Sequence, residues 1–253
     1  MPWNPDQYHK FSAERSAPFD DLLKLVQVRT GLRVVDLGCG TGELTRKLAD
    51  TLPESDVVGL DTSMQMLEKA AKHARPGLRF EQGDQSDLSG EWDLIFSNAA
   101  LQWSEDHAHL FPKLFARLNP GGQLAVQMPS NHEHISHRKI REAAGREPFR
   151  SALAGWVRHA PVLTVDAYAE LLFHQNAEQI TVFEKVYPHV LENADAVVEW
   201  ISGTALVPYF ERLGKEMSEL FLQSLRTELR AAIPGSPVFY PFKRTLITAY
   251  KHG

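Results

Sequence analysis

The chain has 253 residues, of which 43% are hydrophobic and 23% charged, and its formal net charge is -5 at pH 7. These values are close to those of an average globular protein, so fibrous, collagen-like and disordered classes are excluded. The mildly acidic balance argues against a partner nucleic acid, because a surface that binds one would show basic clusters.

Cysteine content and apolar run lengths indicate the cellular compartment. Cys39 is the single cysteine, so no internal disulfide can form. No apolar stretch approaches the ~18 residues needed to cross a bilayer. Residues 1–16 lack the apolar segment of a secretory signal. We therefore expect a cytoplasmic protein without a membrane partner, and the oligomeric state stays open.

Residues 32–127 alternate between short apolar runs and amphipathic segments. The pattern predicts strands at 32–37, 56–61, 78–83, 92–97 and 121–128, with helices at 43–52, 63–74 and 108–118. Strands separated by helices of this length predict right-handed crossovers and a parallel sheet covered on both faces.

The rest of the chain is predicted to be mainly helical, with two further strands. Helices are expected at 132–146, 165–174, 194–204 and 209–232, and strands at 178–191 and 238–251. The fold class is therefore α/β, with a doubly wound, mostly parallel, seven-stranded Rossmann-like sheet, an antiparallel C-terminal edge and a helical cover. We expect one domain over 1–253, with a core of 30–128, 178–191 and 238–251 and a cover of 129–175 and 192–235.

The segment VVDLGCGTGE (34–43) carries the strongest functional signal. A strand leads into Gly38, Gly40 and Gly42 and then into a helix, and glycines let a ligand approach the backbone without meeting a Cβ. A dinucleotide would place its pyrophosphate at this helix start, where Asp36 and Glu43 would repel it. The turn suits a small zwitterion with an ammonium group. The methionine part of S-adenosylmethionine fits, and NAD fits poorly.

Two more strands end at acidic residues. Asp61 ends the second strand, 21 positions after Gly40, where a carboxylate can accept hydrogen bonds from a ribose diol. Asp84 ends the third strand and can accept from an adenine amine, and Thr62 and Met66 can flank the adenine ring. Each acid alone is more often a loop residue or helix cap. Three successive strands that end at acids are much rarer by chance.

Four segments carry a family resemblance, namely 34–45, GLDTSMQML (59–67), GDQSDL (83–88) and FSNAALQW (96–103). Over 30–128 the chain resembles the class I S-adenosylmethionine-dependent methyltransferases. The resemblance implies one methyltransferase domain with S-adenosylmethionine as cofactor. The cofactor-binding residues expected from the motifs and the resemblance are Asp36, Gly38, Gly40, Asp61, Thr62, Met66, Asp84, Gln85, Asn98 and Ala99.

A narrower resemblance extends over the whole chain. Segments 3–18, 98–129, YPHVL (187–191) and GTALVPYF (203–210) are similar to the trans-aconitate methyltransferases. This implies a methyl ester formed on a small polycarboxylic acid, trans-aconitate or a relative, with S-adenosylhomocysteine as by-product. Val207 stands where those enzymes tend to carry an arginine. The acceptor could therefore be another small-molecule or carrier-bound group.

The proposed chemistry needs few catalytic groups. A carboxylate is already ionised at neutral pH and needs no general base, and 98–103 offers Asn98, Gln102 and Trp103 but no base. We assign no catalytic residue and no metal, and we interpret His132, His134 and His137 as part of a polar lid segment. Arg158 and Arg244 are candidate anion contacts, although both are more typical of surface charges. The substrate candidates are Tyr8, Arg15, Trp103, His189 and Tyr209.

Overall fold

The computed structural model describes residues 12–253, with side chains from residue 17 onward. Tyr8 lies outside the described residues, and for Arg15 only the backbone, within helix α2 (Ser12–Leu23), is described. The described chain divides into two compact units. The sheet unit comprises 16–129, 161–185 and 244–253, and the described part of the helical unit comprises 12–15, 130–160 and 186–243. Across 12–253, no helix has the length and apolarity that spanning a membrane requires.

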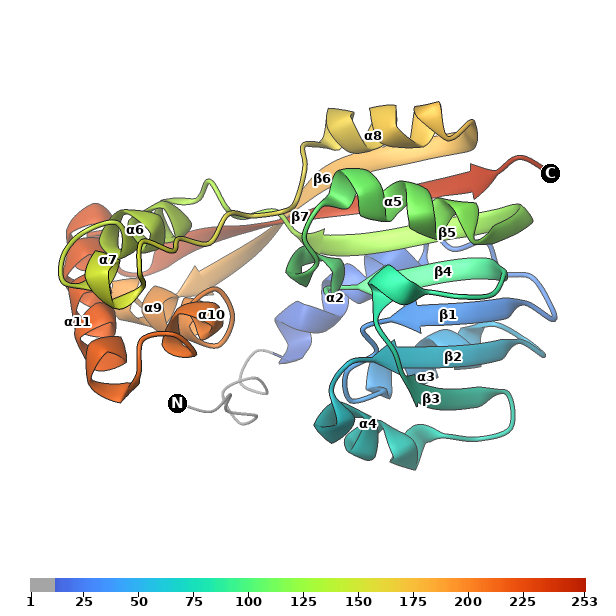
Figure 1. The fold of residues 1–253 in the computed structure, drawn as a ribbon, viewed down its shortest axis with the longest axis horizontal. Coiled ribbons are helices and arrows are strands. Elements are labelled where there is room, and N and C mark those ends of the chain that lie inside the picture. The colour runs from blue at the N-terminus through green and yellow to red at the C-terminus, as the bar shows by residue number, and fades with distance from the viewer. Residues whose placement is uncertain (1–11) are drawn as a thin grey trace. The chain divides into compact units, whose positions relative to one another are not determined.

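Seven strands form one sheet in the order β3-β2-β1-β4-β5-β7-β6 (Figure 1). Strands β1 to β5 pair in parallel, and β7 runs antiparallel to β5. This confirms the predicted mostly parallel sheet with an antiparallel C-terminal strand, which lies between β5 and β6. The bounds are β1 (Arg33–Leu37), β2 (Asp56–Asp61), β3 (Leu78–Gln82), β4 (Trp92–Asn98), β5 (Leu118–Pro129), β6 (Ala177–Leu191) and β7 (Val238–Lys251).

The strand order reverses between β1 and β4, and open α/β sheets bind ligands at such a switch point, outside the carboxyl ends of the strands. Helices of the sheet unit besides α2 are α3 (Glu43–Thr51), α4 (Met64–Ala70), α5 (His107–Ala116) and α8 (Val165–His174). Three short 3₁₀ helices complete it, namely η1 (Ala71–His73), η2 (Gln85–Asp87) and η3 (Leu101–Trp103).

Two neighbouring residues of β1 show why adjacent positions of this strand are both apolar. Val34 is fully buried in a cluster with Phe19 of α2 and Leu48 of α3. Val35 is fully buried in a second cluster with Phe111 of α5. Successive side chains of a strand point to opposite faces, so both faces of the sheet are covered. Burial on both faces accounts for the absence of alternation.

Helix α8 was expected in the helical cover, but it packs on α5 in the sheet unit. Tyr168 and Leu172, one turn apart, are both fully buried. The Tyr168 ring lies 4.7 Å from the ring of Phe111, and its hydroxyl accepts a hydrogen bond from the Leu163 N–H at 3.1 Å. The apolar side chains of α8 are therefore buried against α5, in the helical layer that covers one face of the sheet.

The helical unit contains the remaining helices. They are α6 (Ile135–Ala144), α7 (Phe149–Ala152), α9 (Ala194–Ser202), α10 (Val207–Phe210) and α11 (Lys215–Ala232). The prediction of one helix over 209–232 is wrong. The helical conformation is interrupted between α10 and α11, where Gly214 has a φ of +60°. Phe221, Leu225 and Leu229 of α11 are fully buried in the core of this unit.

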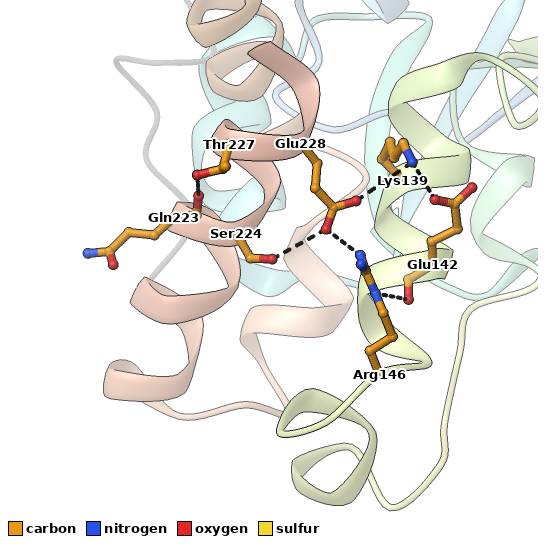
Figure 2. Close-up of polar contacts among 7 residues, drawn as sticks. All are labelled: Lys139, Glu142, Arg146, Gln223, Ser224, Thr227 and Glu228. Carbon is orange, nitrogen blue, oxygen red and sulfur yellow. Dashed lines mark hydrogen bonds and ion pairs between the residues drawn. The ribbon is translucent and has the colours of Figure 1, made fainter. Parts of the chain in front are cut away.

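Ion pairs connect α11 with α6 (Figure 2). Glu228 accepts from Arg146 and lies 3.8 Å from the ammonium of Lys139, which also donates to Glu142 at 2.6 Å. The hydroxyl of Ser224 donates to the Glu228 carboxylate at 3.4 Å. The Glu228 side chain is only 19% exposed, so this network holds two helices of the unit together at a partly buried position.

Candidate functional site

The three glycines between β1 and α3 have different roles. Gly38, Gly40 and Gly42 all have positive φ, at 75°, 55° and 76°. A Cβ on Gly38 would lie 2.2 Å from the Cβ of Ala100, and one on Gly42 would lie 2.7 Å from the ring of Phe80. A Cβ on Gly40 would meet nothing within 4 Å. The first and third glycines are therefore required by packing, and Gly40 leaves its backbone open to a ligand.

Asp36 lies next to this turn and is 4% exposed. Thr45 donates a hydrogen bond to its Oδ2 at 2.6 Å. Burial raises the pKa of Asp36 to about 7, although the Thr45 bond lowers it, and the charge of Asp61 adds to the increase. A carboxyl group with this pKa is ready to ionise when a cationic ligand group arrives.

Asp61, the last residue of β2, connects the ends of two strands. Its Oδ2 accepts a hydrogen bond from the N–H of Gly40 at 2.9 Å, and its Oδ1 accepts one from the N–H of Ser63 at 2.9 Å. A carboxylate oxygen has two lone pairs, so each oxygen can accept one further bond. The side chain is fixed before any ligand binds, with capacity left for a pair of hydroxyl groups.

Asp84 and the residues after it follow β3, which ends at Gln82. Asp84 is partly buried and caps η2, with its Oδ1 accepting from the N–H of Ser86 at 2.8 Å. Among the described residues, no backbone N–H donates to its Oδ2. The Gln85 amide donates to the hydroxyl of Ser104 at 2.6 Å. The structure thus orients the Asp84 carboxyl locally and uses the Gln85 side chain to connect two loops of the sheet unit.

Thr62 and Met66 follow Asp61 at the start of α4. Thr62 is exposed and Met66 partly buried. Ser63 caps this helix, because its hydroxyl accepts from the N–H of Met66 at 3.4 Å. Thr62 therefore directly follows the fixed carboxylate of Asp61, and Met66 lies in the first turn of α4.

A chain of hydrogen bonds, here called the relay, connects Arg244 of β7 through Gln127 of β5 to Asn98 at the end of β4. Arg244 of β7 donates from Nη1 to the Oε1 of Gln127 in β5 at 2.9 Å. The Nε2 of Gln127 donates to the Oδ1 of Asn98 at 2.6 Å. Arg244 is 6% exposed, so the interpretation of this residue as a surface charge is wrong. Sequence reasoning missed Gln127 because only the strand order shows that it lies beside Asn98.

Ala99 and Trp103 follow Asn98. Ala99 has a φ of +56°, which is unusual for a residue with a Cβ, and its N–H donates to the carbonyl of Gln127 at 2.8 Å. Trp103 in η3 is 49% exposed. Such exposure of a large aromatic side chain is compatible with contact to a small ligand.

Cys39 lies within the glycine turn and is 8% exposed. Burial raises the pKa of its thiol, and the charges of Asp36 and Asp61 raise it further. The thiol therefore stays protonated near neutral pH, which disfavours a nucleophilic role.

Two substrate candidates, His189 and Tyr209, lie in the core of the helical unit. His189 is 5% exposed and its ring lies 4.7 Å from that of Trp200. Tyr209 is 2% exposed, stacks on Phe221 at 5.5 Å, and accepts a hydrogen bond from the Arg158 N–H at 3.1 Å. The burial of both side chains favours a packing role over contact with substrate.

The histidine-rich segment caps and lines α6. His134 accepts from the N–H of Ser136 at 3.2 Å at the start of the helix. Burial lowers the pKa of His137 to about 3, and the nearby charges of His134 and His132 lower it further. His137 is therefore neutral at pH 7. Within the described residues, no group of three or more His, Cys, Asp or Glu side chains is placed to hold a metal ion.

These features meet at one edge of the sheet unit. An open glycine, a buried acid that favours a cation, and acids at the ends of β2 and β3 define the class of S-adenosylmethionine-dependent methyltransferases. Residues 29–160 match the methyltransferase domain family. A solved structure, the YcgJ protein from Bacillus subtilis, shares the fold with a TM-score of 0.62 at 15% identity and covers 94% of this chain and 99% of its own.

Curated relatives narrow the class. The chain is 50% identical to trans-aconitate 2-methyltransferase of Deinococcus radiodurans, over 98% of both chains. It is 39% identical to the enzyme of the same name from Azoarcus sp. strain BH72, over 98% of this chain and 99% of that one. The chain belongs to the trans-aconitate 2-methyltransferase family.

Proposed function

We propose that this protein transfers a methyl group from S-adenosylmethionine to a carboxylate of trans-aconitate, giving a methyl ester and S-adenosylhomocysteine. The observation that carries the proposal is the 50% identity to trans-aconitate 2-methyltransferase of Deinococcus radiodurans, which extends over 98% of both chains. The whole chain, on this proposal, works as one methyltransferase domain.

We assign the cofactor to the carboxyl ends of β1, β2 and β3. Asp61 would accept from the ribose hydroxyls, since both of its oxygens are already oriented by backbone N–H groups. Asp84 would accept from the adenine amine, with Thr62 and Met66 beside the ring. The ammonium of the methionine part would lie near Gly40 and Asp36, where a positive charge favours the ionised carboxyl.

The remaining cofactor candidates have mixed support. Ala99 would contribute its backbone, which is held in a left-handed conformation at the end of β4. Gly38 faces Ala100, so its role is to let the loop after β4 come close. Gln85 is engaged with Ser104 through its side chain, which leaves its backbone for a ligand.

The residues at the end of β4 suit an acceptor that needs no base. When bound, S-adenosylmethionine supplies a methyl carbon that a carboxylate oxygen attacks as the carbon–sulfur bond breaks, leaving its electron pair on sulfur and requiring no proton transfer. Asn98 and Gln102 are neutral amides, and Trp103 is an exposed aromatic side chain. These residues would act by aligning the acceptor with the methyl group, excluding water and orienting dipoles toward the reacting atoms.

A labelled-donor assay tests the proposal. The protein would be incubated with S-adenosylmethionine labelled in the methyl group and with trans-aconitate, and the product treated with mild alkali. We expect a labelled ester that alkali hydrolyses, and its absence would overturn the proposal.

A second candidate is a related carboxylic acid as acceptor. Val207, at the start of α10, is apolar and partly buried, where the enzymes that the chain resembles tend to carry an arginine. Loss of one cation would weaken binding of the third carboxylate of a tricarboxylate. If fumarate, a dicarboxylate, gave a higher kcat/KM than trans-aconitate in the same assay, this second candidate would replace the first.

A further inference from the structure

The direction of hydrogen bonding in the relay from Arg244 through Gln127 to Asn98 is determined by chemistry. A guanidinium group has only donors and stays charged, so the group that faces it must be an oxygen. Gln127 therefore turns Oε1 toward Arg244 at 2.9 Å. Its amide nitrogen then faces Asn98, at 2.6 Å from Oδ1.

The same reasoning orients the amide of Asn98. Because Oδ1 accepts from Gln127, the Nδ2 group lies on the opposite side of the amide, with two N–H donors that do not point at Gln127. Asn98 is partly buried at the last position of β4, where its backbone is paired in register with that of Gln127. The relay thus holds Asn98 as a donor at the carboxyl end of the sheet.

The backbone explains why these three residues meet. Gln127 is opposite Leu246 in the antiparallel pairing of β5 and β7, and Arg244 lies two residues before Leu246. Residues two apart on a strand share a face, so Arg244 is a diagonal neighbour of Gln127. Gln127 is fully buried and Arg244 is 6% exposed, which excludes water from competing for the bonds between them.

We propose that Asn98, which the motifs and the family resemblance assigned to the cofactor, instead donates a hydrogen bond from Nδ2 to a carboxylate oxygen of the acceptor. Gln127 and Arg244 are positioning residues that hold it as a donor. This inference rests on the proposed function. The relay offers N–H groups to a ligand, which suits an anionic oxygen and disfavours an ammonium group. Asn98 would then select a carboxylate acceptor over an amine.

The substitution Gln127→Glu tests the relay without altering Asn98. A glutamate accepts through both oxygens, so the Asn98 amide must turn to donate toward it, leaving Oδ1 to face the ligand. We expect the KM for trans-aconitate to rise about 10- to 150-fold, the loss expected for one hydrogen bond to a charged group. The dissociation constant of S-adenosylhomocysteine should stay within about twofold.

Asn98→Asp and Asn98→Ala test the donor itself. Both replace a partly exposed side chain, and we expect the same selective rise in acceptor KM, larger for the aspartate because it repels an anion. Gln179→Glu is the matched control, since Gln179 is exposed on β6 and should leave the KM unchanged. An equal loss of affinity for S-adenosylhomocysteine in the Asn98 variants would show that Asn98 holds the carboxylate of the donor, and would overturn the proposal.

A double-mutant cycle separates positioning from simple structural support. Arg244→Met should raise the acceptor KM in the wild-type background and have no further effect in Asn98→Ala, because Arg244 acts through Asn98. Arg244→Lys keeps a cationic donor and should therefore raise the acceptor KM less than Arg244→Met. If the wild type esterifies trans-aconitate but both Gln127→Glu and Asn98→Asp leave its KM within twofold, the inference fails and the proposed function stands. If the wild type forms no ester, both fail.

Discussion

The carboxylate of Asp61 accepts a hydrogen bond from the N–H of Gly40 at 2.9 Å, across 21 positions of sequence. This bond connects the turn after β1 with the end of β2. The residue that we assign to the ribose therefore also helps to hold the glycine that we assign to the methionine part of the cofactor. The proposed binding groups for the ribose and for the methionine part of the cofactor are therefore hydrogen-bonded to each other.

Asp61→Ala should weaken binding of S-adenosylhomocysteine by about 1–3 kcal/mol, because hydrogen bonds to a charged group are lost. Isothermal titration calorimetry measures the change. Asp56→Ala is the matched control at the opposite end of β2, where an exposed carboxylate pairs with Arg79 at 2.6 Å. Unchanged affinity in the Asp61 variant would show that the ribose is held elsewhere.

Asp36 should make cofactor affinity dependent on pH. With a pKa of about 7, the carboxyl is largely protonated at pH 6 and largely ionised at pH 8. Affinity for the ammonium-bearing S-adenosylhomocysteine should therefore rise over this interval. Asp36→Asn should flatten the profile, and calorimetry at several pH values would detect it. A wild-type profile identical to that of Asp36→Asn would contradict the assignment.

The same group has an opposite effect on the free protein. Its pKa in the folded state, about 7, is above the ordinary value of 3.8, so the folded state binds more protons between these pH values. The free energy of unfolding should fall as pH rises from about 4 to 7. Urea unfolding of wild type and Asp36→Asn at pH 5 and 7 measures this. The free energy of unfolding should fall more between these pH values in the wild type than in Asp36→Asn, and an equal fall would contradict the assignment.

Substitutions of two glycines in the same turn should have different effects. Gly42→Ala places a Cβ 2.7 Å from the Phe80 ring and should cost about 1–3 kcal/mol of stability through overpacking. The Gly40→Val side chain points into open space, and this substitution should mainly abolish cofactor binding. Both glycines have a positive φ, so its strain adds about 1–2 kcal/mol to the cost of either substitution. Thermal unfolding and ligand titration of both variants separate the two effects. Cofactor binding by folded Gly40→Val at wild-type affinity would rule out our assignment of the turn.

Glu228→Gln should loosen the contact between α6 and α11. The carboxylate serves both Arg146 and Lys139, and removing its charge should cost about 1 kcal/mol or less, decreasing with added salt. Hydrogen exchange of α6 amides would report the local effect. Glu219→Gln, at an exposed position of α11, is the control, and equal effects of the two substitutions would argue against a role for the network.

Most of the sheet unit could be predicted from the sequence, because its signals are local. The expected strand at 56–61 and the expected helix at 165–174 agree with the structure to the residue. The glycine turn was also recognised, since its residues are adjacent in the chain. The relay could not be predicted, because Asn98 and Gln127 are 29 positions apart and Gln127 and Arg244 are 117 apart. No local pattern records such a pairing.

Sequence by itself determined the fold class, the glycine turn and the acids at the ends of β2 and β3, since hydrophobic periodicity and turn chemistry depend on near neighbours. The tertiary structure decided which glycine is open to a ligand, that Arg244 is buried, and that Asn98 is held as a donor. Those properties depend on which strands lie side by side, and strand order is set by packing of the whole sheet.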